Sequence, residues 1–399
     1  MSAALDSDPS PARTADAAAG HGLRYIGLMS GTSLDGVDGV VLAQRTNGWQ
    51  IVEAGHTPMP ADLRQAFLVL NEAGPNELHQ AALAGNALAQ LYARTVEDLL
   101  SAAGLVASDI AAIGAHGQTV RHRPAPPGQH PGTSATWQAY TLQINQPALL
   151  AELTGIAVVA DFRSRDVAAG GQGAPLVPGY HHAMFARPDL ETVVVNIGGM
   201  ANATVLHASG DVIGFDTGPG NVLMDQWCER HTGQALDHSG AWGATGTAAP
   251  TLLHRLQQDP FFAWIGPRST GRDYFHLAWL QQHLQAAYPA HSPQPMPQDV
   301  QATLRALTAW SIARAVPLQA AQVVVCGGGV FNKALMNELR QLLSPRELLT
   351  TDELGIPAMQ VEAAAFAWLA MCTCQGLPGN ITAVTGAKGP RVLGALYPA

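Results

Sequence analysis

Residues 25–41 (YIGLMSGTSLDGVDGVV) predict a buried strand, a tight turn and a second strand, and this unit constrains the fold more than any other stretch. Two glycines in the turn allow the backbone to bend sharply and to approach a ligand closely. Thr32 and Ser33 add hydroxyl and amide donors for an anion, and Asp35 and Asp38 add carboxylates for a hydrated Mg2+. An ordinary hairpin turn has the same pattern, so the phosphate-binding interpretation depends on the rest of the chain.

The same unit recurs in the second half of the chain. Residues 192–196 predict a β-branched strand, residues 196–202 (NIGGMAN) a glycine turn, and residues 203–207 a returning strand. A further strand at residues 322–326 runs into the glycines of residues 327–329, where backbone can pass close to a flat or anionic ligand. Two glycine turns at corresponding positions of two α/β halves predict a duplicated fold that closes on a nucleoside triphosphate.

Asp216 follows the strand that residues 212–215 predict, and it is followed by a Gly-Pro-Gly turn. Residues 222–231 then predict a helix that Asn221 caps. The position of Asp216 at the end of a strand marks it as a candidate for chemistry. The alternative is that its side chain caps the following helix.

The first half continues with elements typical of an α/β domain. A strand is expected at residues 51–59, and helices are expected at residues 61–72 and 76–103, where apolar side chains recur at helical spacing. A short buried strand at residues 110–113 leads into residues 115–119 (AHGQT). Polar groups at the carboxyl end of a strand commonly face a ligand crevice in open α/β sheets.

A charged cluster, residues 161–166 (DFRSRD), follows the strand expected at residues 156–160. The glycine-rich residues 170–173 come next and are expected to be a flexible hinge. Residues 124–137 are rich in proline and glycine, and we expect a solvated loop there.

Composition narrows the class of protein. With 399 residues, 47% of them apolar and 13% charged, the chain is long enough for two folded domains. A formal charge of −9 argues against nucleic acid and anionic membrane surfaces as partners. Four irregularly spaced cysteines favour a reducing compartment, and residues 1–21 have no apolar segment of the kind found in signal peptides. We therefore expect a cytoplasmic protein with a disordered tail at residues 1–21.

Six motifs together carry a resemblance to a known family. They are YIGLMSGTSLDGVDGVV, AHGQT, ADFRSRDVAAGGQGAPLVP, NIGGMAN, GFDTGPGNVLMD and GALYP. In these motifs the chain resembles the anhydro-N-acetylmuramic acid kinases, within the superfamily of actin, hexokinase and the heat-shock chaperone ATPases. The resemblance implies an α/β, two-domain, duplicated ribonuclease H-like (actin-like ATPase) fold with an interdomain active-site cleft.

The resemblance also implies a domain division. Domain I would comprise residues 22–160 together with roughly residues 365–399, and would carry the first phosphate turn and sugar contacts. Domain II would comprise residues 161–364, with the second phosphate turn, the glycines of residues 327–329 and the catalytic aspartate.

Enzymes of this family are phosphotransferases with an alcohol group as acceptor. They open the 1,6-anhydro ring of anhydro-N-acetylmuramic acid with water while ATP phosphorylates O6, giving N-acetylmuramic acid 6-phosphate and ADP in peptidoglycan recycling. The implied cofactors are ATP and Mg2+, and the implied partners are ATP and a small amino sugar. The oligomeric state stays open, with a homodimer as one expectation.

The nucleotide would be bound by the three glycine segments. The phosphates are assigned to the first turn and the second turn, and adenosine to the third segment, while Asp35 is the protein carboxylate expected nearest an Mg2+ held mainly by ATP and water. The residues are Gly31, Thr32, Ser33, Leu34, Asp35, Gly36, Val37, Asp38, Gly198, Gly199, Asn202, Gly327, Gly328 and Gly329.

Water is a weak nucleophile at an anomeric carbon, so a carboxylate must accept its proton. The family motif places Asp216 in this role. Asp161 and Asp166 are rivals, although the nearby Arg163 and Arg165 would make Asp161 a poorer proton acceptor.

For the sugar, Thr119, Arg165 and Glu362 are the first candidates, and Gln118 and His116 are weaker ones. Arginine can bind bidentately the lactyl carboxylate that distinguishes muramic acid from glucosamine. The alternatives are structural. Arg163 and Arg165 could form an interdomain ion pair, Thr119 and Glu362 could be caps, and a buried histidine is more often structural than catalytic.

Two rival functions remain open at this point. A simple sugar or acyl-phosphate kinase of the same superfamily would share the ATP site without ring opening. A nucleotide-driven binding protein resembling the chaperone ATPases is the rival from another class, and it would need a peptide-binding module in addition to the ATPase region.

Overall fold

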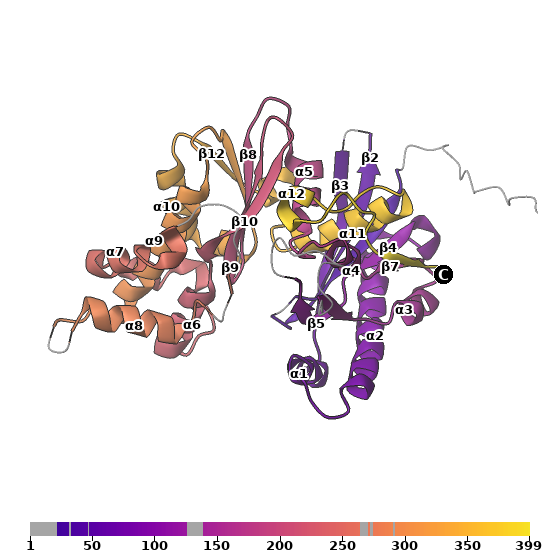
Figure 1. Cartoon of the computed structure of the whole chain (residues 1–399), viewed down its shortest axis with the longest axis horizontal. Coiled ribbons are helices and arrows are strands. Elements are labelled where there is room, and N and C mark those ends of the chain that lie inside the picture. The colour runs from indigo at the N-terminus through magenta and orange to yellow at the C-terminus, as the bar shows by residue number, and fades with distance from the viewer. Residues whose placement is uncertain are drawn as a thin grey trace, which may run out of the picture.

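The computed structural model describes residues 22–31, 33–46, 48–125, 139–263, 270–271, 274–289 and 292–399. The expectations for the tail, for Thr32 and for most of the proline-rich loop fall outside these residues. Figure 1 shows two lobes, one built from the N-terminal strands and helices and the other mainly from residues 190–355. Each lobe is organised around its own sheet.

The first lobe contains a six-stranded mixed sheet in the order β13-β7-β4-β1-β2-β3. β1, β2 and β3 form an antiparallel meander, β4 and β7 continue the sheet parallel to β1, and β13 closes the edge antiparallel to β7. The strands are β1 (Arg24–Met29), β2 (Gly36–Arg45), β3 (Gly48–Pro58), β4 (Ala112–Ala115), β7 (Val158–Ala160) and β13 (Ala395–Tyr397).

The second lobe contains a five-stranded mixed sheet in the order β10-β9-β8-β11-β12. β8, β9 and β10 form an antiparallel meander, and β11 and β12 continue the sheet parallel to β8. The strands are β8 (Thr192–Ile197), β9 (Met200–Leu206), β10 (Val212–Pro219), β11 (Gln322–Cys326) and β12 (Glu347–Thr350).

The two sheets share one topology. Numbered in chain order within each lobe, the five common strands follow the order 3-2-1-4-5, with an antiparallel meander and then two parallel strands. This repetition confirms the predicted α/β fold with a duplicated ribonuclease H-like arrangement. It also places the β1–β2 turn and the β8–β9 turn at equivalent positions of the two halves.

Helices cover both sheets, and two of them pack between the lobes. α11 contacts β1, β2 and β4 of the first sheet and α5, while α5 contacts β8, β9 and β10 of the second. One hydrophobic core therefore contains apolar residues from both sheets, and Figure 1 shows α5 at this junction. The helices are α1 (Ala61–Leu70), α2 (Glu77–Ala103), α3 (Pro147–Thr154), α4 (Ser164–Ala168), α5 (Val177–Phe185), α6 (Val222–Thr232), α7 (Pro250–Gln257), α8 (Leu277–Ala287), α9 (Pro297–Ala315), α10 (Lys333–Leu343), α11 (Val361–Cys374) and α12 (Thr382–Thr385).

Most predicted elements are confirmed within a few residues. The strand expected at residues 110–113 begins two residues later, as β4. β10 extends through Asp216 to Pro219, so Asp216 lies inside a strand and does not follow it. The predicted domain boundary near residue 365 falls within α11; the division into domains stays a prediction.

One further pair of strands lies outside these two sheets. β5 (Gln118–Arg123) and β6 (Tyr140–Ile144) form a separate antiparallel pair beside the first sheet. Within the described parts of the chain, no helix has both the length and the apolar character needed to cross a bilayer.

Candidate functional site

The first glycine turn connects β1 to β2 and is anchored by Leu34. The Leu34 side chain is 2% exposed and packs in the core of the first lobe, and its backbone adopts φ 55°. Ser33 and Asp35 on either side are exposed, and the Ser33 hydroxyl donates to Asp35 Oδ1 at 2.6 Å. A buried leucine thus directs the polar residues of the turn outward.

Asp38 behaves differently from Asp35. Its Oδ1 accepts from Gln360 Nε2 at 3.3 Å and lies 2.9 Å from His56 Nδ1. Burial raises the pKa of the Asp38 carboxyl, and the bond with His56 partly opposes that shift. Asp38 therefore joins β2 to the residue that precedes α11, whereas the exposed Asp35 is the carboxylate of this turn that a hydrated cation can reach.

The second glycine turn connects β8 to β9 and is supported by the chain that follows β10. Gly220 N and Asn221 N donate to the carbonyl oxygens of Gly199 and Gly198 at 2.9 and 2.8 Å, and Asn221 Nδ2 donates to Ile197 O at 3.2 Å. Asn221 precedes α6, but its side chain makes no capping hydrogen bond. The predicted cap is therefore wrong, because this side chain binds the turn.

The third glycine segment lies against the second turn. Cys326, the last residue of β11, pairs with Asn196 of β8, and the following Gly327 adopts φ 81°. A Cβ atom on Gly327 would lie 2.3 Å from Asn196 Oδ1, and one on Gly329 would lie 2.3 Å from Ile197 Cγ2. Only glycine allows this close approach, so two of the predicted nucleotide-binding segments meet at one end of the second sheet.

Asp216 lies beside the same turn. It pairs in register with Asn202 of β9, which in turn pairs with Asn196 of β8. A β-bulge between Asp216 and Gly218 interrupts the ladder, a feature common next to active sites. Because Asp216 lies five residues before Asn221, its side chain is too distant in sequence to be the N-cap of α6.

The backbone amide of Thr270 donates to Asp216 Oδ2 at 2.8 Å. Nothing in the sequence indicated this contact, because residues 259–276 have no clear periodicity or motif. Thr270, Gly220, Asn221 and Gln360 are all residues of the candidate site that the sequence analysis missed.

Three sugar candidates lie where β4 ends and β5 begins. His116 and Gln118 are buried, and Gln118 Nε2 donates to Gly31 O at 3.2 Å, which ties this segment to the first turn. Thr119 Oγ1 accepts from Gln143 Nε2 at 3.3 Å, so it pairs with the neighbouring strand β6 and is not a helix cap.

Arg163 and Arg165 lie in different environments. Arg163 is largely buried, with Nε donating to His116 Nε2 at 3.0 Å and Nη1 donating to Gly173 O at 2.8 Å. Arg165 is exposed, and no hydrogen bond or ion pair within the described residues involves its side chain. The interdomain ion pair considered for these arginines is not present among the described residues.

Glu362, in the first turn of α11, interacts electrostatically with Arg163 and Asp38. Burial raises the pKa of the Glu362 carboxyl; the positive charge of Arg163 opposes the shift, and the negative charge of Asp38 adds to it. Burial also lowers the pKa of Arg163 to about 10. Glu362 is thus close enough to both Arg163 and Asp38 to be influenced by their charges.

The two rival carboxylates have structural partners. Asp166 is fully buried; its Oδ1 accepts from Asn380 and Thr385, and its Oδ2 accepts from Gly173 N at 2.8 Å. Asp161 Oδ1 accepts from the Ser164 hydroxyl at the start of α4. Asp166 therefore organises the chain around it, which argues against its role as a base.

The glycine-rich residues 170–173 are held by the same contacts. Gln172 N donates to Thr385 O at 2.7 Å, and a Cβ atom on Gly171 would lie 2.2 Å from Asp166 Oδ2. Hydrogen bonds and close packing therefore hold this segment in the described structure, and its role as a hinge stays a prediction.

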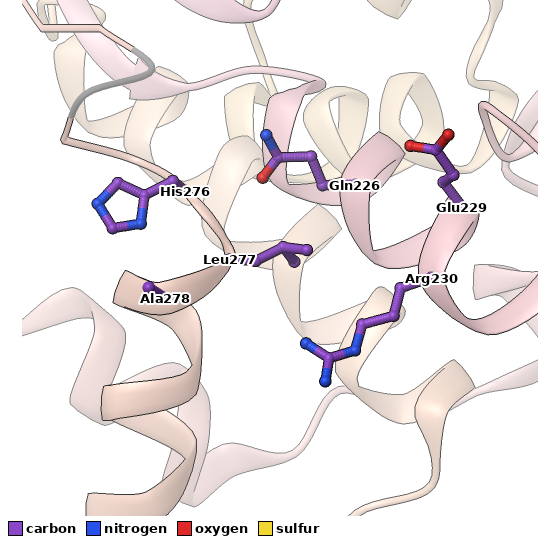
Figure 2. A pocket seen from close by; sticks show the side chains of 6 residues that line it. All are labelled: Gln226, Glu229, Arg230, His276, Leu277 and Ala278. Carbon is purple, nitrogen blue, oxygen red and sulfur yellow. The ribbon is translucent and has the colours of Figure 1, made fainter.

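One surface pocket of the described structure lies away from these residues. It has a volume of about 530 Å3, lies between α6 and the start of α8, and is lined by none of the predicted site residues. Figure 2 shows that Glu229 and Arg230 point to opposite sides and that the labelled side chains do not converge on one point. We assign it no ligand. Among the described residues, no three His, Cys, Asp or Glu side chains gather where they could hold a metal ion.

A family profile and three similar curated relatives all carry the same family name. A profile of the family described as anhydro-N-acetylmuramic acid kinase matches residues 23–399. A protein of that name from Bordetella pertussis is 53% identical over 382 residues, which cover 95% of this chain and 97% of the relative. A second, from Variovorax paradoxus, is 54% identical over 385 residues, covering 94% of this chain and 99% of the relative.

A third relative of the same name, from Cupriavidus metallidurans, is 51% identical over 380 residues, covering 94% of this chain and 97% of the relative. The family profile spans both sheets, all three glycine segments and Asp216. The chain therefore belongs to the anhydro-N-acetylmuramic acid kinase family.

Proposed function

We propose that this chain phosphorylates O6 of 1,6-anhydro-N-acetylmuramic acid with ATP while water opens the anhydro bridge, giving N-acetylmuramic acid 6-phosphate and ADP. The observation that carries the proposal is the position of Asp216 beside the second glycine turn, in register with Asn202 and bonded by Thr270. The relatives' names identify the sugar. We place this reaction in cytoplasmic recycling of peptidoglycan.

The glycine segments fit a nucleotide. Apart from its chain neighbours, a Cβ atom on Gly31, Gly198 or Gly328 would come no nearer than 3.6 Å to a described residue, so the backbone at these positions is not tightly covered. Exposed backbone at such positions can lie against phosphate oxygens. The phosphates are assigned to the two turns, and the adenosine side to residues 327–329.

When bound, ATP would supply the phosphoryl group, and its Mg2+ would supply positive charge that neutralises the phosphate oxygens. Asp35 fits one contact to a hydrated Mg2+, because its side chain is exposed and its partner in the turn is a serine hydroxyl. Mg2+ usually keeps several waters and binds through one or two carboxylates, so a dedicated cluster of carboxylates is not required.

Asp216 is the proposed base. The water oxygen forms a bond to the anomeric carbon, the bond from that carbon to O6 breaks, and the released O6 takes the γ-phosphoryl group. The proton of the water passes to the Asp216 carboxylate. One base is enough, because phosphoryl transfer neutralises the charge that develops on O6.

We propose that the sugar binds to the residues that lie between the first glycine turn and α11. The exposed Arg165 is the proposed partner of the lactyl carboxylate, since a guanidinium can bind a carboxylate through two parallel hydrogen bonds. Thr119 and Glu362, with Gln118 and His116, are proposed to contact the hydroxyl and acetamido groups.

Isotopically labelled water tests the coupled reaction. The enzyme is incubated with ATP and the anhydro sugar in 18O-water, and the product is analysed by mass spectrometry. The proposal predicts one phosphoryl group, an opened ring and one 18O atom at the anomeric position. A phosphorylated product that keeps its anhydro bridge would instead support a simple sugar kinase.

A further inference from the structure

Thr270 contacts Asp216 across a separation of 54 residues in the chain. Its backbone N–H donates to Asp216 Oδ2 at 2.8 Å, from the segment between the turn Pro260–Ala263 and α8. A donor at one carboxylate oxygen restricts the orientation of the whole group, because the two oxygens are rigidly linked.

The hydroxyl of Thr270 is a second unusual feature. Its Oγ1 is buried and has no hydrogen-bond partner among the described residues. An unpartnered buried hydroxyl is costly, and such groups in native proteins usually bind water or a ligand. This hydroxyl belongs to the residue that holds the proposed base.

Gly271, the residue that follows Thr270, is linked to the core of the second lobe. The buried Asp259 accepts from the Tyr274 hydroxyl at 2.7 Å and from Trp279 Nε1 at 2.9 Å. Tyr274 N in turn donates to Gly271 O at 3.1 Å, one residue after Thr270. These bonds connect Gly271, next to Thr270, through Tyr274 to the buried Asp259.

We propose, resting on the function proposed above, that Thr270 is a positioning residue for the reaction at Asp216. Its amide orients the carboxylate, and its hydroxyl binds the oxygen of a hydroxylic ligand that faces Asp216. That oxygen belongs either to the attacking water or to a hydroxyl of the sugar. A hydroxyl suits both, because it can donate and accept a hydrogen bond.

Two substitutions test the role of the hydroxyl. Thr270→Val keeps the shape and the backbone amide but removes the hydroxyl, and Thr270→Ser keeps the hydroxyl. We measure sugar affinity without nucleotide, and then kcat and KM for the sugar with saturating ATP. Thr270→Val is expected to lower kcat/KM by about 3- to 10-fold, and Thr270→Ser to stay within about twofold of wild type. Thr270→Ala repeats the test if valine does not fit.

The two sources of the oxygen give different results. If the hydroxyl binds the sugar, Thr270→Val weakens sugar affinity by the same factor. If it binds the attacking water, sugar affinity is unchanged and kcat falls. Either result supports the inference, provided that Thr270→Ser keeps the sugar affinity and the kcat of wild type.

Thr192→Val is the matched control. Thr192 is also in the second lobe and its Oγ1 is also buried without a partner among the described residues. It lies at the start of β8, four residues and roughly 13 Å along the strand from Asn196. Its substitution is expected to leave kcat and sugar affinity unchanged.

Two outcomes would overturn the inference in distinguishable ways. If wild type turns over the sugar and Thr270→Val matches it in kcat and in sugar affinity, the role of Thr270 is wrong and the proposed function stands. If wild type shows no sugar-dependent ATP turnover, the proposed function and this inference are both wrong.

Discussion

Arg163 Nε donates a 3.0 Å hydrogen bond to His116 Nε2, and this bond fixes the state of the histidine. Because a guanidinium cannot accept a hydrogen bond, Nε2 must carry a lone pair. Burial, and then the positive charge of Arg163, lowers the pKa of His116 well below its usual value of 6.5. His116 is therefore a neutral acceptor that holds Arg163, and Arg163 also bonds Gly173 O.

Arg163→Gln is expected to lower the free energy of unfolding by about 1–3 kcal/mol, since it removes donors from two largely buried acceptors. Urea denaturation measures the change. Arg165→Gln is the matched control, two residues away and exposed, with an expected change within about 0.5 kcal/mol. Equal destabilisation by the two substitutions would contradict the structural role of Arg163.

Arg165 is expected to select for the lactyl carboxylate. Arg165→Gln should weaken the affinity for anhydro-N-acetylmuramic acid by about tenfold or more, because a charge-assisted pair is lost. The affinity for the analogue that lacks the lactyl group should not change. Calorimetric titration of both sugars provides the test, and an equal loss for both would assign the lactyl carboxylate to another residue.

The duplicated fold was accessible from the sequence because most of its strands are apolar runs and its turns are marked by glycines. The turn at residues 31–36 and the turn at residues 196–202 each carry these signals locally. The long helix α2 was equally clear, since its apolar residues recur at helical spacing and Gly104 ends it with φ 64°.

Long-range contacts carried no such signal. Thr270 contacts Asp216 across 54 residues of the chain, and only tertiary folding brings the two together. Asn221 looked like a helix cap because it precedes α6, and only the folded chain shows that its side chain binds Ile197 O. The glycines of residues 170–173 suggested flexibility, whereas Gly171 packs closely against Asp166 and leaves no room for a side chain.

Gly198 is expected to bind phosphate through its backbone. Gly198→Ala should leave the thermal midpoint unchanged, since the new Cβ meets no described atom nearer than 3.6 Å, but should weaken ATP affinity by about tenfold or more. Gly220→Ala is the contrasting variant, because its Cβ would lie 2.3 Å from Gly198 O and must displace the turn. ATP affinity equal to wild type in Gly198→Ala would contradict the assignment of phosphates to this turn.

His181 is expected to make stability depend on pH. Burial lowers the pKa of His181 to about 3, while the unfolded chain protonates near 6.5, so stability is lost as pH falls below about 6.5. Between pH 8 and pH 5 this single group should cost about 2 kcal/mol of unfolding free energy. His181→Gln should reduce the acid-dependent loss by that amount.

The neighbouring His182 on α5 is exposed and provides the control. His182→Gln should keep the pH dependence of wild type, measured by urea denaturation at both pH values. An unchanged pH dependence in His181→Gln would show that His181 is not buried in its neutral form.

The central claim is that Asp216 is the base, and the turnover of Asp216→Asn compared with Asp166→Asn tests it most directly. Asp216→Asn keeps an acceptor for Thr270 N, so folding and ATP and sugar binding should persist while kcat falls by about 100-fold or more. Asp166→Asn should instead destabilise the fold, because an amide cannot satisfy all three donors around it, with turnover per folded molecule largely kept. If Asp216→Asn turned over the sugar within about tenfold of the wild-type rate, the account would be contradicted. Loss of turnover in folded Asp166→Asn would contradict it as well.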